Sequence, residues 1–281
     1  MSPLSQRVAT AAVLLPLALV AVFALPPAWF ALVSLVVVVT AALEWSALAR
    51  FTWARRLGFL GVLVAGAAAL LGMLWTAGEP GWTGGVVTLA CGMAAAFWIA
   101  VAPAWAILRP PVSVTPGMAP IGWIILIGFW VALVQLQARS PWLLLAAMVV
   151  VWIADTAAFF SGRAFGRHKL APSVSPGKTW EGVAGALLAV AVYAMVCAWL
   201  LVRSGLAAEP RPATLALWLL LGITLAAVSV IGDLYESWLK RAAGVKDSGR
   251  LLPGHGGILD RIDALLAALP IAALAAKAWL P

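Results

Sequence analysis

The chain has 281 residues, of which 64% are hydrophobic and only 10% are charged, and its mean hydropathy is +1.06. A soluble domain has no core large enough to bury that much apolar surface, so the composition excludes a soluble globular protein. The net charge of +8 fits basic loops beside anionic lipid headgroups, and we expect no nucleic-acid partner.

Apolar stretches of about 17 to 25 residues, the length that crosses a hydrocarbon core of roughly 30 Å, recur along the chain. They predict an all-α, polytopic membrane helix bundle with about nine transmembrane helices. Only Pro26 and Pro27 divide the first two spans, and Arg7 leaves a cleaved signal peptide as an alternative for the first. The expected spans are 8–25, 27–43, 57–76, 84–106, 119–138, 141–162, 182–202, 213–235 and 264–280.

The distribution of basic residues predicts the orientation of the bundle, because positive charge marks cytoplasmic loops. With the N-terminus inside, fourteen of the eighteen Lys and Arg residues fall on the cytoplasmic side. The other side receives only Arg139, Arg203, Arg211 and Lys277. We therefore expect a multi-pass membrane protein with its N-terminus and its basic loops on the cytoplasmic side.

The acidic residues divide the chain into two parts. Residues 1–140 contain only Glu44 and Glu79, and we expect them to form a scaffold of about five spans. Eight of the ten acidic residues follow position 150, so residues 141–281 are expected to be the catalytic region, with about four spans. Its cytoplasmic loops are expected at 163–181 and 236–263.

Asp155 lies about eight residues before Arg163, roughly 12 Å along a helix and thus below the membrane surface. An ionised group at such depth costs about 2.5–3.5 kcal/mol and is normally kept because it faces a cavity, an ion or a partner. The alternative is a structural pair with a loop cation.

Ser237 lies four residues after Asp233, three before Lys240 and four before Arg241, so these side chains can share one helix face. This pattern predicts a polar stripe that extends from a membrane span. A helix end with a surface ion pair is the alternative interpretation.

Asp260 and Asp263 are expected on one side of the first turn of the last span. The helix macrodipole favours carboxylates there, so capping explains one of them but not both. The preceding turn, His255-Gly256-Gly257, allows backbone N–H groups to approach an anion closely, although as a turn signal it is weak.

Familiar motifs are absent. The stretch "SPGKTW" has Pro172 where a phosphate-binding loop requires glycine, and we expect no strand before it. Leu259 stands where GxGxxG requires its last glycine, and neither HExxH nor GxSxG occurs. Zinc and catalytic-triad chemistry are therefore not expected. The remaining carboxylates suit Mg²⁺ held with substrate phosphates, which predicts phosphoryl or nucleotidyl transfer to a lipid.

Residues 237–263, "SWLKRAAGVKDSGRLLPGHGGILDRID", match every fixed position of S-x-x-K-R-x4-K-D…P-x-H-G-G-x-x-D-R-x-D. They resemble the signature of the phosphatidate cytidylyltransferases, or CDP-diacylglycerol synthases. Residues 155–182 resemble the second cytoplasmic segment of that family, and "QRVATAAVLLPLAL" resembles its usual start. Residues 45–140 are similar only in being apolar. Ser173 departs from the lysine expected in many relatives, and we assign it no role.

The resemblance implies transfer of the cytidylyl group from CTP to phosphatidate, giving CDP-diacylglycerol and pyrophosphate for phospholipid biosynthesis. It also implies Mg²⁺, with room for a second monovalent or divalent cation, and a homodimer in contact with membrane lipid. On this basis we expect Asp233 and Asp260 to be the principal metal ligands, with Asp155 and Asp263 as further ligands. The expected catalytic residues are Asp233, Asp260, Asp263, Lys240 and Arg241. The expected substrate-binding residues are Lys178, Thr179, Ser237, Lys246, Asp247, His255, Gly256, Gly257 and Arg261.

Three other functions fit less well. A transporter could use the intramembrane Asp155 and Asp233, but it predicts two similar halves, and these halves differ sharply in polarity. An alcohol phosphotransferase that consumes CDP-diacylglycerol needs a DG-x2-AR…G-x3-D-x3-D pattern, which is absent. A polyprenyl transferase needs DDxxD motifs, and none occurs.

Overall fold

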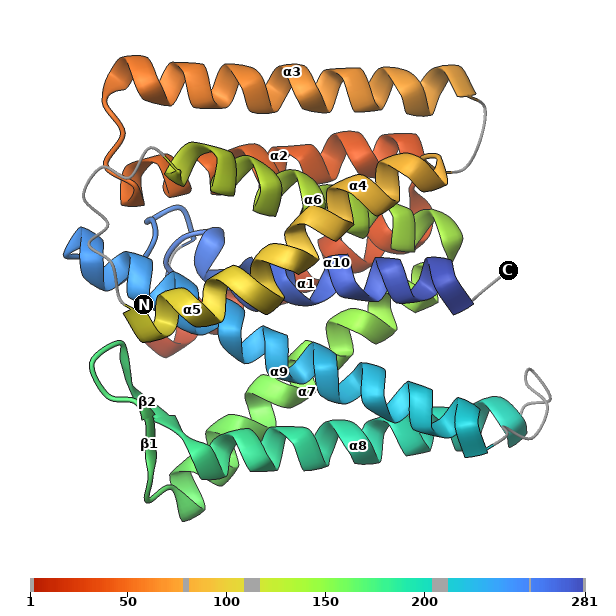
Figure 1. The fold of residues 1–281 in the computed structure, drawn as a ribbon, viewed down its shortest axis with the longest axis vertical. Coiled ribbons are helices and arrows are strands. Elements are labelled where there is room, and N and C mark those ends of the chain that lie inside the picture. Colours follow the sequence, from red (N-terminus) through yellow and green to blue (C-terminus); the bar gives the residue numbers. More distant parts are fainter. Residues whose placement is uncertain (1–2, 78–80, 109–116, 204–211, 253, 280–281) are drawn as a thin grey trace.

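The computed structural model describes residues 3–77, 81–108, 117–203, 212–252 and 254–279, which form a helix bundle with one short hairpin (Figure 1). Arg109, Arg211 and Pro253 lie outside the described residues. The helices are α1 (Pro3–Ala24), α2 (Pro27–Leu48), α3 (Trp53–Ala77), α4 (Gly84–Ala96), η1 (Phe97–Val101), α5 (Ala102–Leu108), α6 (Met118–Arg139), α7 (Pro141–Phe165), α8 (Trp180–Arg203), α9 (Pro212–Ala243) and α10 (Leu259–Trp279).

The predicted fold class is confirmed, because each of the nine expected spans overlaps a helical stretch. Within the described part of the chain, seven helical stretches, from α2 to α9, are long and apolar enough to cross a membrane. The apolar part of α1, Ala9–Ala24, is shorter. The helix α10 carries two aspartates and an arginine in its first five residues. Nine complete crossings therefore stay a prediction.

The span expected at 84–106 is a continuous helix that contains one π-helical turn between two α-helical parts. Between α4 and α5, residues Phe97–Val101 form a π-helical turn, η1. Its buried Phe97 and Trp98 pack edge-on against Tyr235 of α9. The turn thus aims two large rings at the helix that carries Asp233.

Helix α10 lies at the centre of the bundle, packed against α9, α6, α4 and α7 (Figure 1). Its middle, from Ala264 to Leu269, is buried and is made of alanine and leucine, so its neighbours can approach closely. Helices α3 and α8 lie on opposite outer sides. In the first turn of α10, Leu259 and Ile262 are buried as well, whereas Arg261 is exposed.

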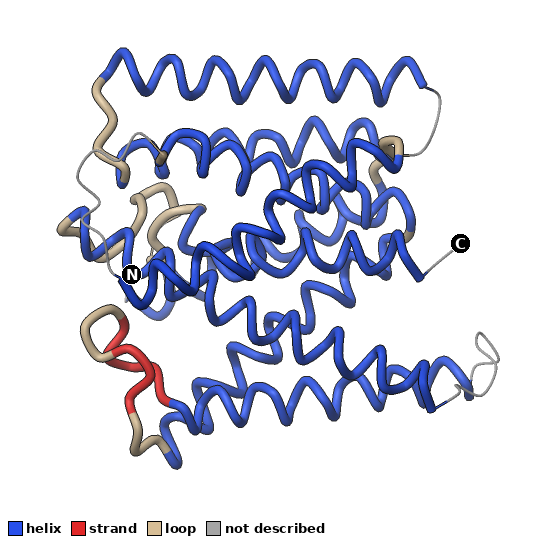
Figure 2. Tube along the Cα trace, viewed as in Figure 1, coloured by secondary structure: helices blue, strands red, loops and turns tan. Residues whose placement is uncertain are grey.

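The two expected cytoplasmic loops are shorter than predicted, since helices extend into both of them. Within 163–181, β1 (Lys169–Ala171) and β2 (Ser175–Thr179) form an antiparallel hairpin. The expectation of no strand before "SPGKTW" was wrong. The stretch is still not a phosphate-binding loop, because Pro172 stands where that loop requires glycine. Figure 2 shows the hairpin at the same end of the bundle as the loop between α9 and α10.

Candidate active site at the junction of α9 and α10

Helices α9 and α10 touch where the signature aspartates lie. A Cβ atom on Gly232 would stand 2.6 Å from the backbone oxygen of Asp263, so only glycine permits this approach. The next residue, Asp233, binds the Lys178 ammonium at 2.7 Å through one oxygen. Its other oxygen accepts a hydrogen bond of 3.2 Å from Ser237. The contact therefore joins α9, α10 and strand β2 around Asp233.

Two further carboxylates lie near this pair. The charge of Asp155 on α7 interacts with the charges of Asp233 and Lys178. Asp263, near the start of α10, interacts with the same two groups. Three carboxyl groups thus interact with one lysine, and a cation bound beside them would stabilise their charged forms.

Lys240 lies in a second polar group, about two turns after Asp233 along α9. Its ammonium forms ion pairs with Glu236 and with Asp260, the latter at 2.6 Å. Glu236 is buried, and the sequence analysis did not select it. Because both partners of Lys240 are carboxylates of the protein, its charge is already balanced before any phosphate arrives.

Asp260 accepts hydrogen bonds from four donors. The Lys240 ammonium binds one oxygen, and the other receives Ser248 N at 2.8 Å, Gly257 N at 2.8 Å and the Ser248 hydroxyl at 3.0 Å. Burial alone would raise the pKa of Asp260, but these bonds hold it below its ordinary value. The carboxylate thereby organises the loop between α9 and α10.

The glycine-rich turn is shaped by carboxylates of the protein. Gly256 has φ of +83°, and a Cβ there would stand 2.6 Å from Asp260 Oδ2. At Gly257 a Cβ would stand 2.2 Å from Ser248 Oγ and 2.4 Å from Glu44 Oε2. A phosphate contact at this turn stays a prediction, since the Gly257 N–H already donates to Asp260.

The expected polar stripe on α9 is only partly one surface. Asp233 and Ser237 bind each other as their spacing predicts. Lys240 turns towards Glu236 and Asp260, whereas the Arg241 Nε–H donates to the Val174 carbonyl at 3.5 Å, at the tip of the hairpin. The two cations therefore belong to different contacts.

The remaining expected substrate-binding residues lie around these groups. Thr179 is buried, and its hydroxyl oxygen accepts the Gly182 N–H at 3.1 Å, which caps the start of α8. His255 is partly buried, and its Nδ1 atom has no hydrogen-bond partner among the described residues. Lys246, Asp247 and Arg261, which are also expected to bind substrate, have exposed side chains.

Glu44 and Arg50 are contacts that the sequence analysis missed. Glu44 accepts the N–H groups of Ile258 and Leu259 at 3.0 and 2.8 Å, although it lies in the expected scaffold. Arg50 donates to the carbonyl of Ala243, the last residue of α9, at 3.1 Å. One signal in the sequence could have indicated Glu44, namely the rarity of acids in the first 140 residues. A charged group at the end of a membrane span is costly and is normally kept because it has a partner.

The carboxylates fit a magnesium ion only in part. Within the described ranges, no three His, Cys, Asp or Glu side chains are arranged to hold a metal by themselves. Magnesium is commonly bound by one or two carboxylates together with substrate phosphates, and Asp233 with Asp263 suits that arrangement. Asp260 fits least well, because a metal would have to compete with its four donors.

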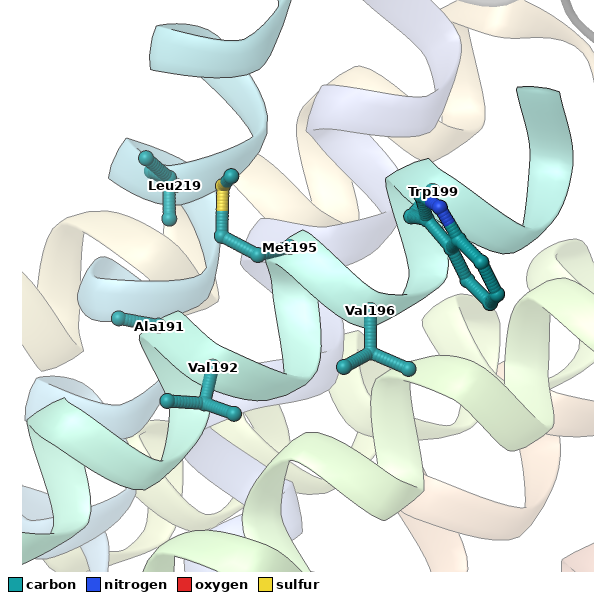
Figure 3. A pocket seen from close by; sticks show the side chains of 6 residues that line it. All are labelled: Ala191, Val192, Met195, Val196, Trp199 and Leu219. Carbon is teal, nitrogen blue, oxygen red and sulfur yellow. The ribbon is translucent and has the colours of Figure 1, made fainter. Parts of the chain in front are cut away.

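An apolar groove lies elsewhere, between α8 and α9. Its volume is about 500 Å³, and Figure 3 shows its lining. The lining residues are Ala191, Val192, Met195, Val196, Trp199 and Leu219. None of them is charged, so the groove has no means of binding a phosphate.

The sequence is similar to known proteins along its whole length. The cytidylyltransferase family matches residues 5–279. A phosphatidate cytidylyltransferase from Pseudomonas aeruginosa is 41% identical over 293 residues, which cover 98% of this chain and 97% of that relative. A protein of the same name from Haemophilus influenzae is 50% identical over 128 residues, covering 46% of this chain and 43% of the relative. Another, from Brucella suis, is 56% identical over 119 residues, covering 42% and 41%.

Proposed function

This chain belongs to the cytidylyltransferase family, and on that premise we propose that it transfers the cytidylyl group from CTP to phosphatidate. The products are CDP-diacylglycerol and pyrophosphate. The observation that carries the proposal is the full-length similarity to a phosphatidate cytidylyltransferase. The bundle supports it, because a protein with several apolar spanning helices meets its lipid substrate within the membrane.

The reaction joins two polyanions, so their repulsion is the main barrier that the protein must lower. The attacking phosphatidate oxygen is already anionic and needs little help from a general base. It displaces pyrophosphate from the α-phosphorus of CTP, in line with the bond that breaks. Arg241, Lys246 and Arg261 lie at the site end with exposed side chains, which suits them to receive phosphates.

Lys178 and Lys240 act closer to the carboxylates. Lys178 bridges the hairpin to Asp233, so a phosphate arriving there would meet an ammonium and a carboxylate together. Lys240 keeps Asp260 in place beneath the turn. We assign Lys240 mainly to the organisation of this turn.

We further propose that Asp233 and Asp263 hold Mg²⁺ with the substrate phosphates, with Asp155 beside them and Asp260 as a weaker candidate. When bound, the ion would neutralise charge that develops on the phosphate oxygens. We also propose that the site lies on the cytoplasmic face of the inner membrane and that the active form is a homodimer.

The reaction can be tested with purified protein in mixed micelles, given labelled CTP and either phosphatidate or CDP-diacylglycerol. We expect labelled CDP-diacylglycerol and equimolar pyrophosphate with phosphatidate only. Consumption of CDP-diacylglycerol, or no transfer from CTP, would contradict the proposal.

Removal of divalent cations tests the metal separately. We expect EDTA to abolish turnover and added Mg²⁺ to restore it, because uncompensated phosphates would otherwise face Asp233 and Asp263. The unaltered protein dialysed without EDTA is the control. Full turnover in EDTA would refute the metal assignment while leaving the reaction itself intact.

A further inference from the structure

The loop between α9 and α10, residues 244–258, is attached at both ends to the end of α2. Glu44 is near the end of α2, and Arg50 lies two residues after the last residue of that helix. Both are distant from the loop in sequence but bind it in the fold. The attachment is not explained by packing alone, since Glu44 is a buried carboxylate in a segment with almost no other acids.

Glu44 satisfies the start of α10 from another helix. The first N–H groups of a helix have no partner within it, and a carboxylate placed there is favoured by the macrodipole. Glu44 Oε1 accepts Ile258 N, and Oε2 accepts both Leu259 N and the Ser248 hydroxyl, at 2.8 Å each. One side chain thus joins Ser248, inside the loop, to the C-terminal end of the loop.

Ser248 connects Glu44 to the active-site aspartate. Its hydroxyl oxygen lies 2.8 Å from Glu44 Oε2 and 3.0 Å from Asp260 Oδ2, and it accepts Asp260 N at 3.2 Å. The single hydroxyl proton serves one carboxylate at a time. Asp260 in turn holds Lys240, so the contacts form a continuous chain from α2 to α9.

Two glycines leave space for Glu44. A Cβ on Gly249 would stand 2.3 Å from Glu44 Oε1, and a Cβ on Gly257 would stand 2.5 Å from the same atom. Neither has the positive φ that by itself calls for glycine. The absence of side chains at these positions is therefore explained by the carboxylate that they enclose.

Arg50 holds the other end of the loop. Its guanidinium donates to the Ala243 carbonyl, one of the last carbonyls of α9, which lack partners within that helix. Arg50 itself has φ of 52°, in the left-handed region that residues other than glycine rarely adopt. Together, Glu44 and Arg50 form what we call the α2 clamp.

We propose that the α2 clamp positions the active site: Glu44 and Arg50 hold the 244–258 loop so that Asp260 and Lys240 keep their orientation. These are positioning residues, since the geometry gives them contacts to the loop and not to the reacting atoms. The kinetic consequences rest on the proposed function, whereas the effect on the loop does not.

The main test compares Glu44→Gln with the unaltered protein. A glutamine keeps the shape, but its amide nitrogen cannot accept the donors that converge on the carboxylate. We expect hydrogen exchange of the Ile258 and Leu259 amides, measured without substrate, to accelerate at least tenfold. We also expect turnover per folded protein to fall about tenfold or more and KM for CTP to rise several-fold.

The matched control is Ser46→Ala. Ser46 is two residues further along α2 and fully buried, but its hydroxyl binds only the Leu43 carbonyl of its own helix. This control should leave loop exchange and KM unchanged. If Glu44→Gln does not fold, Arg50→Ala replaces it, because Arg50 is exposed and its loss should accelerate exchange only near Ala243 and Gly244.

The outcomes separate the two proposals. Unchanged loop exchange and KM in a folded Glu44→Gln protein, or in Arg50→Ala where that replaces it, would overturn the α2 clamp even if the unaltered enzyme is active. Activity lost only in proportion to unfolded protein, with exchange raised throughout the bundle, would also overturn it. An unaltered protein that fails to use CTP would refute the proposed function, while accelerated exchange limited to the loop would still support the clamp.

Discussion

The signature aspartates differ in what their oxygens already bind. Asp260 has four donors, whereas Asp233 has a lysine and a serine hydroxyl and lies beside two other acids. The spacing of residues in the sequence cannot distinguish these surroundings, because the Asp260 donors come from α9 and from the loop. Asparagine at position 260 would lose these contacts whether or not a metal binds there, so Asp233 is the sharper probe.

We predict that Asp233→Asn lowers turnover roughly a hundredfold or more while the protein stays folded. The substitution removes the negative charge that would hold a cation and that holds Lys178 in place. Such an electrostatic contribution is worth about 2.7–4 kcal/mol in a transition state. Steady-state kinetics at limiting Mg²⁺, with the melting temperature in detergent, measure this. The control is Glu181→Gln, whose carboxylate binds His168 beside the hairpin. Near-normal turnover in Asp233→Asn would remove Asp233 from the metal site.

We predict a different effect at the neighbouring cations. Lys240→Met leaves Glu236 and Asp260 buried without their partner, and breaking a buried pair in this way costs about 3–5 kcal/mol. Arg241→Met should instead weaken substrate use with little loss of stability. Thermal unfolding of both variants compares the costs directly. Adding Glu236→Gln to Lys240→Met should recover part of the lost stability, because it removes an unpaired buried charge. No recovery would mean that Glu236 is already protonated in the Lys240→Met protein.

At the scale of elements, the helices follow from the length of the apolar stretches, and their order could be predicted, while the number that cross the membrane stays a prediction. The hairpin could not, since "KLA" and "SPGKT" are short and carry a proline and a glycine. Its position depends on partners from elsewhere: Arg241 at its turn and Asp233 at its second strand. Contacts across the fold, which no local pattern encodes, determine this element.

We predict that close packing of α4 on α6 depends on Gly128. A Cβ there would stand 2.5 Å from the Cβ of Ala94 and 2.9 Å from the Ala90 carbonyl oxygen. Such contacts of small residues let membrane helices approach, and overpacking them costs about 1–3 kcal/mol. Gly128→Ala should lower the melting temperature, whereas Gly92→Ala on α4 should not, because nothing lies within 4 Å of its Cβ. Equal effects would show that this contact adjusts freely.

At the scale of the whole molecule, α10 connects the two halves of the sequence. It packs against α4 and α6 of the expected scaffold as well as α7 and α9 of the expected catalytic region. Sequence reasoning found the acids and cations near the site but assigned the first half no part in it. Glu44 shows why: its role depends on being 214 residues from Ile258 in sequence and 3.0 Å from it in the fold.

Helix α10 also extends from one end of the bundle to the other. Its 21 residues span about 30 Å, close to the thickness of a hydrocarbon core. Asp260 lies at one end, while at the other Lys277 donates to the Gly84 carbonyl at the start of α4.

We therefore predict that Gly177→Cys in the hairpin and Thr83→Cys before α4 react from opposite faces, in a protein without Cys91 and Cys197. In intact cells an impermeant thiol reagent should label only Thr83→Cys, and opening the cells should add Gly177→Cys. Labelling of Gly177→Cys in intact cells would reverse the proposed orientation, and labelling of both would show that the site does not lie across the membrane from α4's start.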